Sequence, residues 1–222
     1  MAIDQPHDLD WRDGVPVSRR FDDPFYSLQD GLAEARHVFL GGNDLPQRFR
    51  DGFHVAELGF GTGLNFAATA LAWRQAGVTG RLFFTSFEAF PMAVEDVRQA
   101  LGDFPETVPF ASTIEAALDG RACVDDLGIT LSVEVGDARQ TVPAWEGRAD
   151  AWFLDGFAPA RNPELWEEAL MQAVAARTAP GGTCATYSAA GAVRRALDAA
   201  GFAVERRPGF GRKRHMTAGR LR

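Results

Sequence analysis

The stretch at residues 53–66, FHVAELGFGTGLNF, determines how the rest of the chain is interpreted. It starts as a short apolar strand, continues through the acid Glu57, and then places glycines at three alternate positions, Gly59, Gly61 and Gly63. Glycines at this spacing let a backbone approach a bound ligand without a Cβ in the way, and they tolerate positive φ. An apolar helix follows at once, so the loop would present N–H groups to its ligand at a helix N-terminus. We therefore expect a nucleotide-like cofactor here.

Around this loop, strand-like and helix-like segments alternate along the chain. Strands are predicted over residues 81–88, 129–137, 149–156 and 183–188, and helices over 31–40, 64–75, 92–101, 163–177 and 191–200. Such alternation predicts a parallel sheet with crossover helices. Residues 202–221 read as two final strands around a short turn, and such strands must be antiparallel. The expected fold class is α/β, with the Rossmann-like, seven-stranded sheet and antiparallel final hairpin of class I methyltransferases.

The N-terminal part of the chain has a different pattern. Residues 9–27 alternate short apolar pairs around Asp13-Gly14, a dipeptide typical of tight hairpin turns. We expect a small β-hairpin extension within residues 1–30 and one main domain over residues 31–222. With 46% hydrophobic and 24% charged residues, the 222-residue chain can bury the core of such a domain.

Features of membrane, secreted and metal-binding proteins are missing from the sequence. No run approaches the ~18 apolar residues of a membrane span, and the N-terminus, MAIDQPHDLDWRD, lacks the basic and apolar regions of a secretory signal. Cys123 and Cys184 show no metal-ligand spacing and are interpreted as buried thiols in a reducing compartment. We expect a cytoplasmic protein that binds neither a membrane nor a metal ion.

Acidic residues end four of the predicted strands: Glu57, Glu88, Asp137 and Asp155. In open parallel sheets, ligands bind beyond the carboxyl ends of the strands. A single acid at such a position is commonly a helix cap. Four of them on consecutive strands beside one glycine loop favour a shared site.

The glycine loop distinguishes two kinds of cofactor. A dinucleotide fingerprint, G-x-G-x-x-G, would need a third glycine at position 64, where the chain has Leu64. The acid before the first glycine, Glu57, would repel a pyrophosphate but suits a ligand with an amino group and a sulfonium. Glu88 could then accept both ribose hydroxyls, and Asp137 could accept from an adenine amino group. We therefore expect S-adenosylmethionine as the cofactor.

Asp155 ends the fourth strand, ahead of Gly156 and Pro159, which shape an exposed loop. In this fold that strand end faces the transferred methyl group, so a carboxylate there can hold an amine acceptor in line with the sulfonium. A primary amine, with a pKa of about 10.4, arrives mostly protonated. Asp155 is the nearest group that could accept its proton, and we expect it to be the catalytic residue.

Several strings are similar to one protein family. The most specific are LDGFAPARNP at residues 154–163 and GFGRKR at 209–214, together with PVSRRFDDPFYS at 16–27 and GLAEARHVFLGGNDLPQRF at 31–49. From about Asp10 to the end, the chain resembles the methyltransferase domain of the bacterial tRNA 5-methylaminomethyl-2-thiouridine biosynthesis bifunctional proteins.

The resemblance implies methyl transfer from S-adenosylmethionine to the amine of 5-aminomethyl-2-thiouridine at the tRNA wobble position, with Asp155 on the acceptor side. It implies cofactor contacts from Glu57, Gly59, Phe60, Gly61, Thr62, Gly63, Glu88, Gly136 and Asp137. In the family a flavin-dependent oxidase domain often makes the amine. We expect either a stand-alone methyltransferase, with a separate oxidase as a partner, or an excised domain.

Two positions depart from the family pattern. Arg161 stands where the family has a lysine after F-A-P-A, so the charge is kept but the compact ammonium is replaced by a planar fork. The pair Phe25-Tyr26 is swapped relative to the family order.

Charge is distributed unevenly along the chain. Residues 194–222 hold nine basic and two acidic residues, although the net charge of the whole chain is −7. An acidic body with a basic end suggests an anionic partner engaged at one face. Together with the resemblance, this predicts that tRNA phosphates contact Arg161, Arg194, Arg195, Arg212, Lys213 and Arg214.

Two other functions stay open. An aminopropyltransferase of the spermidine synthase type has the same fold, a related cofactor and an acid at the same strand end, but it gains nothing from a basic tail. A non-catalytic RNA-binding module that kept the fold would not need the set of acids.

Overall fold

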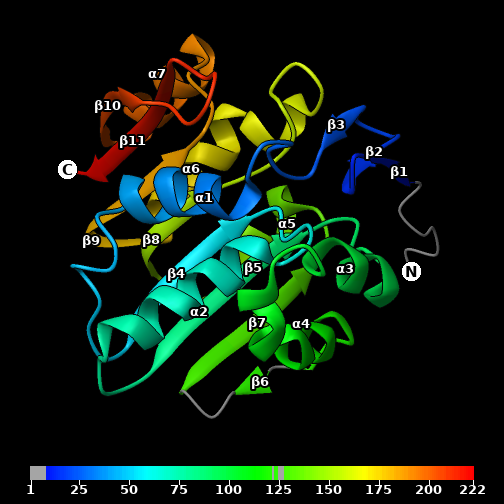
Figure 1. Cartoon of the computed structure of the whole chain (residues 1–222). Coiled ribbons are helices and arrows are strands. Elements are labelled where there is room, and N and C mark those ends of the chain that lie inside the picture. The colour runs from blue at the N-terminus through cyan, green and yellow to red at the C-terminus, as the bar shows by residue number, and fades with distance from the viewer. Residues whose placement is uncertain (1–8, 122, 125–127) are drawn as a thin grey trace.

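An eight-stranded mixed sheet forms the centre of the computed structural model, which describes residues 9–121, 123–124 and 128–222 (Figure 1). The strand order is β10-β11-β9-β8-β4-β5-β7-β6. The strands are β4 (Phe53–Leu58), β5 (Leu82–Glu88), β6 (Cys123–Val124), β7 (Ile129–Val135), β8 (Ala149–Leu154), β9 (Thr178–Thr186), β10 (Phe202–Pro208) and β11 (His215–Leu221).

The pairing of these strands confirms the predicted fold class. Strands β4, β5, β7, β8 and β9 are parallel, whereas β11 is antiparallel to both of its neighbours, β9 and β10. The final hairpin therefore inserts its second strand between the first and the rest of the sheet. β6 is a two-residue addition antiparallel to β7 at the edge, so the seven predicted strands become eight.

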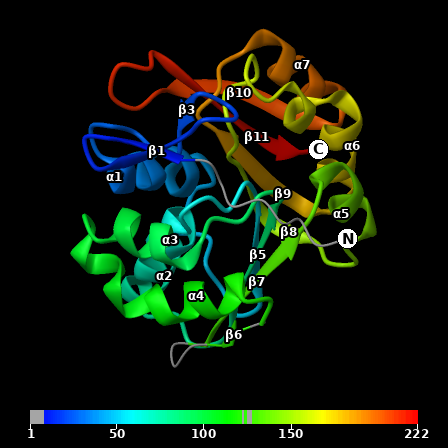
Figure 2. The same cartoon turned by 90° about the vertical axis from the view of Figure 1, so that its right-hand side faces the viewer.

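Helices cover both faces of the sheet (Figure 2). One face carries α1 (Gly31–Ala35) with its π-helical continuation η1 (Arg36–Leu40), α2 (Leu64–Ala76), α3 (Val94–Leu101), the 3-10 helix η2 (Pro105–Phe110) and α4 (Ala111–Leu118). The other carries α5 (Ala138–Ala144), the 3-10 helix η3 (Pro163–Trp166), α6 (Glu168–Ala176) and α7 (Gly191–Ala199). Because side chains alternate along a strand, Phe153 of β8 packs into the first layer and Trp152 into the second, both fully buried.

Three local features differ from the predicted pattern. The helix expected over 163–177 is divided between η3 and α6, because the backbone at Glu167 is extended (ψ 146°). Strand β9 begins at Thr178, so Pro180-Gly181-Gly182 lies inside a strand that shifts register, rather than between a helix and a strand. Helix α5 was not predicted; it starts because the Asp137 side chain caps it by accepting from Arg139 N at 2.9 Å.

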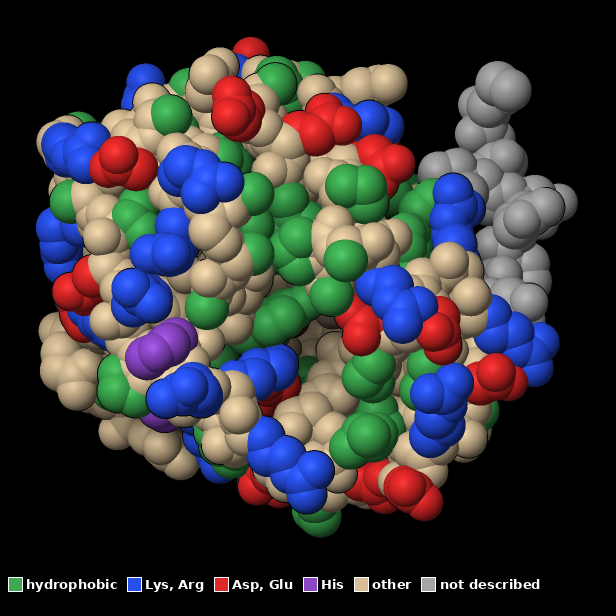
Figure 3. Space-filling model, turned by 90° about the horizontal axis from the view of Figure 1, so that it is seen from above, with side chains coloured by type: hydrophobic (Ala, Val, Ile, Leu, Met, Phe, Trp, Pro, Cys, Tyr) green, Lys and Arg blue, Asp and Glu red, His purple; other side chains and the backbone are tan. Residues whose placement is uncertain are grey.

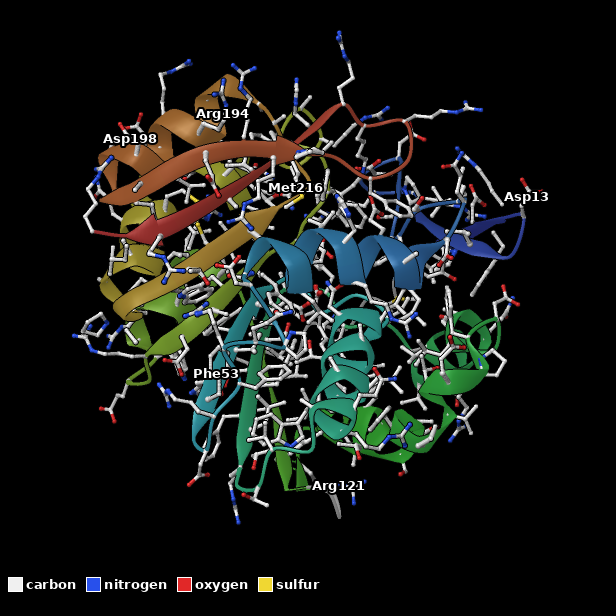
Figure 4. All side chains as sticks on the ribbon, turned by 60° about the vertical axis from the view of Figure 1, so that its left-hand side comes forward. Asp13, Phe53, Arg121, Arg194, Asp198 and Met216 are labelled. Carbon is white, nitrogen blue, oxygen red and sulfur yellow. The ribbon has the colours of Figure 1, made fainter. Side chains whose placement is uncertain are left out.

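The N-terminal hairpin is confirmed for the described part of the extension; residues 1–8 lie outside it. β1 (Leu9–Arg12) and β2 (Val15–Ser18) are antiparallel and are joined by Asp13 and Gly14, both with positive φ (51° and 81°). Asp13 marks the tip of this hairpin, pointing away from the body (Figure 4). A third strand, β3 (Asp23–Pro24), pairs with β2 and leads the chain back toward the main sheet.

Two further observations concern the expected absences. Within the described ranges, no helix is long and apolar enough to cross a membrane, and no group of three or more His, Cys, Asp and Glu side chains could hold a metal ion. Cys184 is a buried free thiol, whereas the side chain of Cys123 lies outside the described part.

Candidate cofactor and acceptor site

The sheet topology places the glycine loop and Asp155 side by side. β4 lies between β5 and β8, so the strand order reverses at β4 and leaves a crevice beyond the carboxyl ends of β4 and β8. The loop after β4 stays attached to β5, because Gly59 N donates to Phe87 O at 2.9 Å. Asp155, directly after β8, is tied to β4 because its N–H donates to Leu58 O at 3.1 Å.

Glycine is required where the loop meets Asp155. Gly59 has φ +85°, and a Cβ on it would lie 2.3 Å from the Asp155 carbonyl oxygen, well inside van der Waals contact. Gly61, with φ +54°, faces the Phe25 ring of the N-terminal segment. Gly63 adopts the left-handed conformation at the N-cap of α2. The loop therefore threads between β8 and the N-terminal segment with no room for side chains at its first glycine.

A cavity of about 1080 Å³ opens above these strand ends. Its walls come from the glycine loop, the segments 20–29, 87–90 and 155–165, helix α1, and the β10–β11 connection. Seen from the top of Figure 1, this face of the molecule is hollowed, with apolar side chains in the hollow and basic ones around it (Figure 3). The volume is at the upper end of that of small-molecule sites, so it suits two ligands side by side.

Most of the residues expected to contact the cofactor line this cavity, namely Gly59, Phe60, Gly61, Thr62, Glu88 and Asp137, and so does Asp155, the expected catalytic residue. Glu57, Gly63 and Gly136 do not line it. Of the residues expected to contact tRNA, Arg161, Arg212 and Lys213 are part of the wall, whereas Arg194, Arg195 and Arg214 are not.

Glu57 lies behind the cavity wall and is fully buried. Its Oε1 accepts from Asn65 Nδ2 at 2.9 Å and its Oε2 accepts from Ser86 Oγ at 2.6 Å. Burial raises its pKa well above the usual range, although both hydrogen bonds oppose the shift. Its contact with the cavity runs through Asn65, which lines the wall and which the sequence patterns did not single out.

Asp155 occupies the centre of the arrangement. Its Oδ2 accepts from Asn65 Nδ2 at 2.7 Å, so one amide joins the two carboxylates. Burial raises the pKa of Asp155 to about 7, and the charge of Glu34 adds to the rise while the Asn65 hydrogen bond and Lys213 lower it. A carboxylate with that pKa is suited to exchanging a proton near neutral pH.

Glu88 and Asp137 line the cavity on the other side of the glycine loop, and both are already engaged. Glu88 accepts from the N–H groups of Gly61 at 3.1 Å and Phe90 at 2.8 Å, which fixes its carboxylate against the loop. Asp137 is held by the Arg139 guanidinium, with Nη2 at 2.7 Å from Oδ2, and this lowers the pKa of Asp137.

Aromatic side chains form a part of the wall that the sequence reasoning missed. Phe157 stacks on Phe21 with ring centroids 4.6 Å apart and meets Phe25 edge-on at 5.1 Å. Asp23 Oδ2 accepts from Ala158 N at 2.8 Å, so the N-terminal segment is bound to the loop that follows Asp155. The sequence does contain these aromatic residues, two phenylalanines in FDDPF and one in LDGF. Only the tertiary fold shows that they pack against each other, so the sequence alone could not place them in one wall.

The basic C-terminal end is only partly free. Arg207 and Arg220 both pair with Asp44, and Arg222 pairs with Asp198. Arg194 and Asp198 both lie on α7, where Asp198 is exposed and Arg194 is half-buried (Figure 4). Lys213 pairs with Glu34, and Arg161 pairs with Asp22 at 2.6 Å. Among the described residues no ion pair involves Arg195, Arg212 or Arg214, and all three are exposed.

Comparisons with known proteins agree with this geometry. Residues 95–222, more than half of the chain, match a family model described as S-adenosyl-L-methionine-dependent methyltransferase. The chain is 48% identical over 221 residues to the tRNA 5-methylaminomethyl-2-thiouridine biosynthesis bifunctional protein MnmC of Caulobacter sp. (strain K31), covering 93% of this chain and 37% of that protein. It is 43% identical to the protein of the same name from Chromobacterium violaceum, covering 95% and 34%. The chain thus spans little more than a third of these relatives.

Solved structures show the same fold. A crystal structure of MNMC2 from Aquifex aeolicus superposes with a TM-score of 0.78 at 26% identity, covering 99% of this chain and 72% of that one. TrmN from Thermus thermophilus has a TM-score of 0.53 at 17% identity, covering 93% of this chain and 54% of that one, and shows a likeness of fold alone. The family match and the relatives named MnmC confirm the resemblance found in the sequence and the expected cofactor. The chain belongs to the S-adenosyl-L-methionine-dependent methyltransferases.

Proposed function

We propose that this chain methylates the amine of 5-aminomethyl-2-thiouridine at the wobble position of tRNA, giving 5-methylaminomethyl-2-thiouridine. The relatives named MnmC, at 43–48% identity, support this substrate. The observation that carries the proposal is the Asp155 carboxylate, which lies in the cavity beside the glycine loop and is held there by Asn65. An amine acceptor placed against it would lie next to the cofactor.

The cavity fits the cofactor that the family uses. The glycine loop lines the cavity with backbone at Gly59 and Gly61, and the carboxylates of Asp155 and Glu88 give the cavity the acidic character that a cationic ligand needs. S-adenosylmethionine, when bound, supplies an electrophilic methyl group on a sulfonium. We assign its adenosine to the wall formed by Gly61, Glu88 and Asp137.

In this proposal, three of the residues expected to contact the cofactor support the site without touching the cofactor. Gly63 and Gly136 shape the backbone outside the cavity wall, both with positive φ. Glu57 contributes through the Asn65 amide that it orients, rather than by touching the ligand.

Asp155 holds and deprotonates the acceptor in this proposal. The primary amine arrives protonated, since its pKa is about 10.4. One N–H of the ammonium donates to Asp155, which takes the proton and leaves the nitrogen lone pair free to attack the methyl carbon. With a pKa of about 7, Asp155 is a stronger base than an ordinary aspartate, and about half of it is ionised, and so able to accept a proton, at pH 7. Placement of the amine supplies much of the remaining acceleration.

The rim of the cavity would receive the anticodon loop. A wobble base can reach Asp155 only if it is turned out of its stack into the cavity, where aromatic side chains such as Phe157 could contact it. Arg212 and Arg214, on the β10–β11 connection, would contact phosphates at the rim. We further propose that a flavin-dependent oxidase, on another chain or another segment, supplies the aminomethyl group.

Methyl transfer to defined acceptors tests the proposal. The protein is incubated with S-adenosylmethionine labelled in the methyl group and with tRNA that bears or lacks the aminomethyl group. We expect label only in the aminomethyl tRNA, and its loss in Asp155→Asn. The matched control is Asp150→Asn on β8, the strand that Asp155 follows, since Asp150 accepts hydrogen bonds from Arg50 and His54 N at the amino end of β8. Label in unmodified tRNA or in a polyamine would contradict the proposal.

A further inference from the structure

The single lysine of the sequence, Lys213, points into the cavity rather than only toward solvent. Its Nζ lies 2.8 Å from Glu34 Oε1 and 4.0 Å from the centroid of the Tyr187 ring. Glu34 belongs to α1, Tyr187 follows β9, and Lys213 is on the β10–β11 connection. Three segments far apart in the sequence therefore converge on one ammonium group.

A carboxylate beside an aromatic face is a binding site for an ammonium ion. The carboxylate supplies a charge-assisted hydrogen bond, and the ring attracts the cation through its quadrupole. The Glu34 side chain is only 11% exposed, whereas the Lys213 side chain is 46% exposed. The carboxylate is therefore largely enclosed, and much of the lysine side chain that pairs with it faces solvent. Lys213 can therefore leave Glu34 by moving toward solvent.

The ammonium site adjoins the catalytic carboxylate. Tyr187 Oη donates to the carbonyl oxygen of Gly156, the residue after Asp155, at 2.6 Å. Glu34, Tyr187, Lys213 and Asp155 all line the same cavity. Glu34 and Lys213 are both near enough to Asp155 for their charges to act on it. An ammonium that replaced that of Lys213 would lie in the part of the cavity where the acceptor amine must arrive.

We propose that Glu34 and the Tyr187 ring form the recognition site for the primary ammonium of the acceptor, and that Lys213 occupies this site until the acceptor displaces it. This inference rests on the function proposed above. It makes Glu34 a specificity-determining residue: an uncharged wobble substituent could not displace Lys213, and one that carried a carboxylate would be repelled by Glu34. The displaced Lys213 would join Arg212 and Arg214 at the rim.

Steady-state kinetics with aminomethyl tRNA separates this role from two alternatives. Glu34→Gln should raise the KM for the tRNA about 10- to 100-fold, the cost of one charge-assisted hydrogen bond. Lys213→Met should lower this KM by about 3- to 10-fold, because the acceptor no longer competes with the lysine. If the Lys213–Glu34 ion pair served only to hold the β10–β11 connection against α1, both variants would lose that contact and both would raise KM. If it mainly contacted phosphate, Lys213→Met would raise KM and flatten its salt dependence. Either result overturns the proposal.

Because Lys213 is the sole lysine, its displacement can be observed without catalysis. Protein labelled with ¹³C-lysine should give one set of side-chain NMR signals, shifted by the Tyr187 ring current. Titration with the nucleoside 5-aminomethyluridine should move the ε signal toward its free value, and titration with uridine should not. No movement, or equal movement with both nucleosides, would overturn the proposal. Displacement without methylation by the wild type would instead contradict only the proposed function.

Discussion

Asn65 Nδ2 lies 2.7 Å from Asp155 Oδ2, so a side chain in the first turn of α2 holds the carboxylate that follows β8. The same Nδ2 donates to Glu57 Oε1 at 2.9 Å. Because both amide hydrogens go to carboxylates, the orientation of the Asn65 amide is determined and Asp155 is kept in one position. The buried Glu57 thereby acts on the cavity without touching it.

This bridge makes a prediction about Asn65→Ala, for which Ser86→Ala is the matched control. Each change removes one hydrogen bond to Glu57 and should reduce the free energy of unfolding by about 1 kcal/mol. Only Asn65→Ala also releases Asp155. We expect it to lower kcat by about 10- to 100-fold, since a misplaced catalytic group loses most of its advantage. Ser86→Ala should keep kcat within about twofold of the wild type, and equal losses in the two variants would contradict the role of the bridge.

The raised pKa of Asp155 predicts how stability depends on pH. The folded carboxyl has a pKa of about 7 against an ordinary value of 3.8, so the folded state holds a proton that the unfolded state has lost. Its stabilising contribution is present below about pH 4 and is lost as the pH rises through about 7. Asp155→Asn, which cannot ionise, should therefore match the wild type at about pH 4 and exceed it by about 4 kcal/mol at about pH 8, at about 1.4 kcal/mol for each unit of the pKa difference.

Urea unfolding of the two proteins without cofactor, at several pH values, measures this difference. The free energies of unfolding should diverge between about pH 4 and pH 8. A difference that stayed constant across this range would show that Asp155 titrates as an ordinary exposed aspartate.

The position of the site could be predicted from the sequence because it depends on connectivity. Alternating strands and helices imply a parallel sheet, and a glycine loop after its first strand must lie at the carboxyl edge with the acid that follows β8. The side chain of Glu57 could not be placed in the same way. Whether it meets the cavity depends on the twist of β4 and on Asn65 lying above it, and neither follows from apolar spacing.

The number of basic residues near the C-terminus that stay free to bind a partner also depends on the tertiary fold. Lys213 pairs with Glu34 across 179 residues and Arg207 with Asp44 across 163, contacts that no local pattern reveals. Of the basic residues near the C-terminus, several are therefore neutralised within the fold. Helix α5 escaped prediction because it is only seven residues long and contains Pro143.

Gly59→Ala tests the contact between the glycine loop and Asp155. Gly77→Ala is the control, because Gly77 also has positive φ (+63°) but nothing lies within 4 Å of its added Cβ. Gly77→Ala should reduce the free energy of unfolding by about 1 kcal/mol, because alanine disfavours positive φ. Gly59→Ala adds a clash with the Asp155 carbonyl oxygen, so we expect it to lose more than about 2 kcal/mol. Calorimetric titration should also show that it no longer binds S-adenosylmethionine, and intact binding would contradict the assignment of this loop.

The salt dependence of tRNA binding tests the basic rim, because the nine basic residues of the C-terminal segment are not equivalent. Arg212 and Arg214 precede β11 beside the cavity, whereas Arg220 and Arg222 lie at its other end and pair with Asp44 and Asp198. Each phosphate contact contributes about 0.7–0.9 to the slope of log K against log salt concentration. Replacing Arg212 and Arg214 with Gln should therefore lower the slope by about 1.4–1.8.

The charge-matched control replaces Arg220 and Arg222 with Gln. This variant loses the same formal charge, but the two arginines are held by carboxylates at the far end of β11, so the slope should stay that of the wild type. Filter binding or fluorescence anisotropy at several salt concentrations gives both slopes. Equal reductions in the two variants would mean that tRNA binding depends only on the net charge of the protein. That result would contradict a localised contact at the rim, for which the positions of the charges must matter.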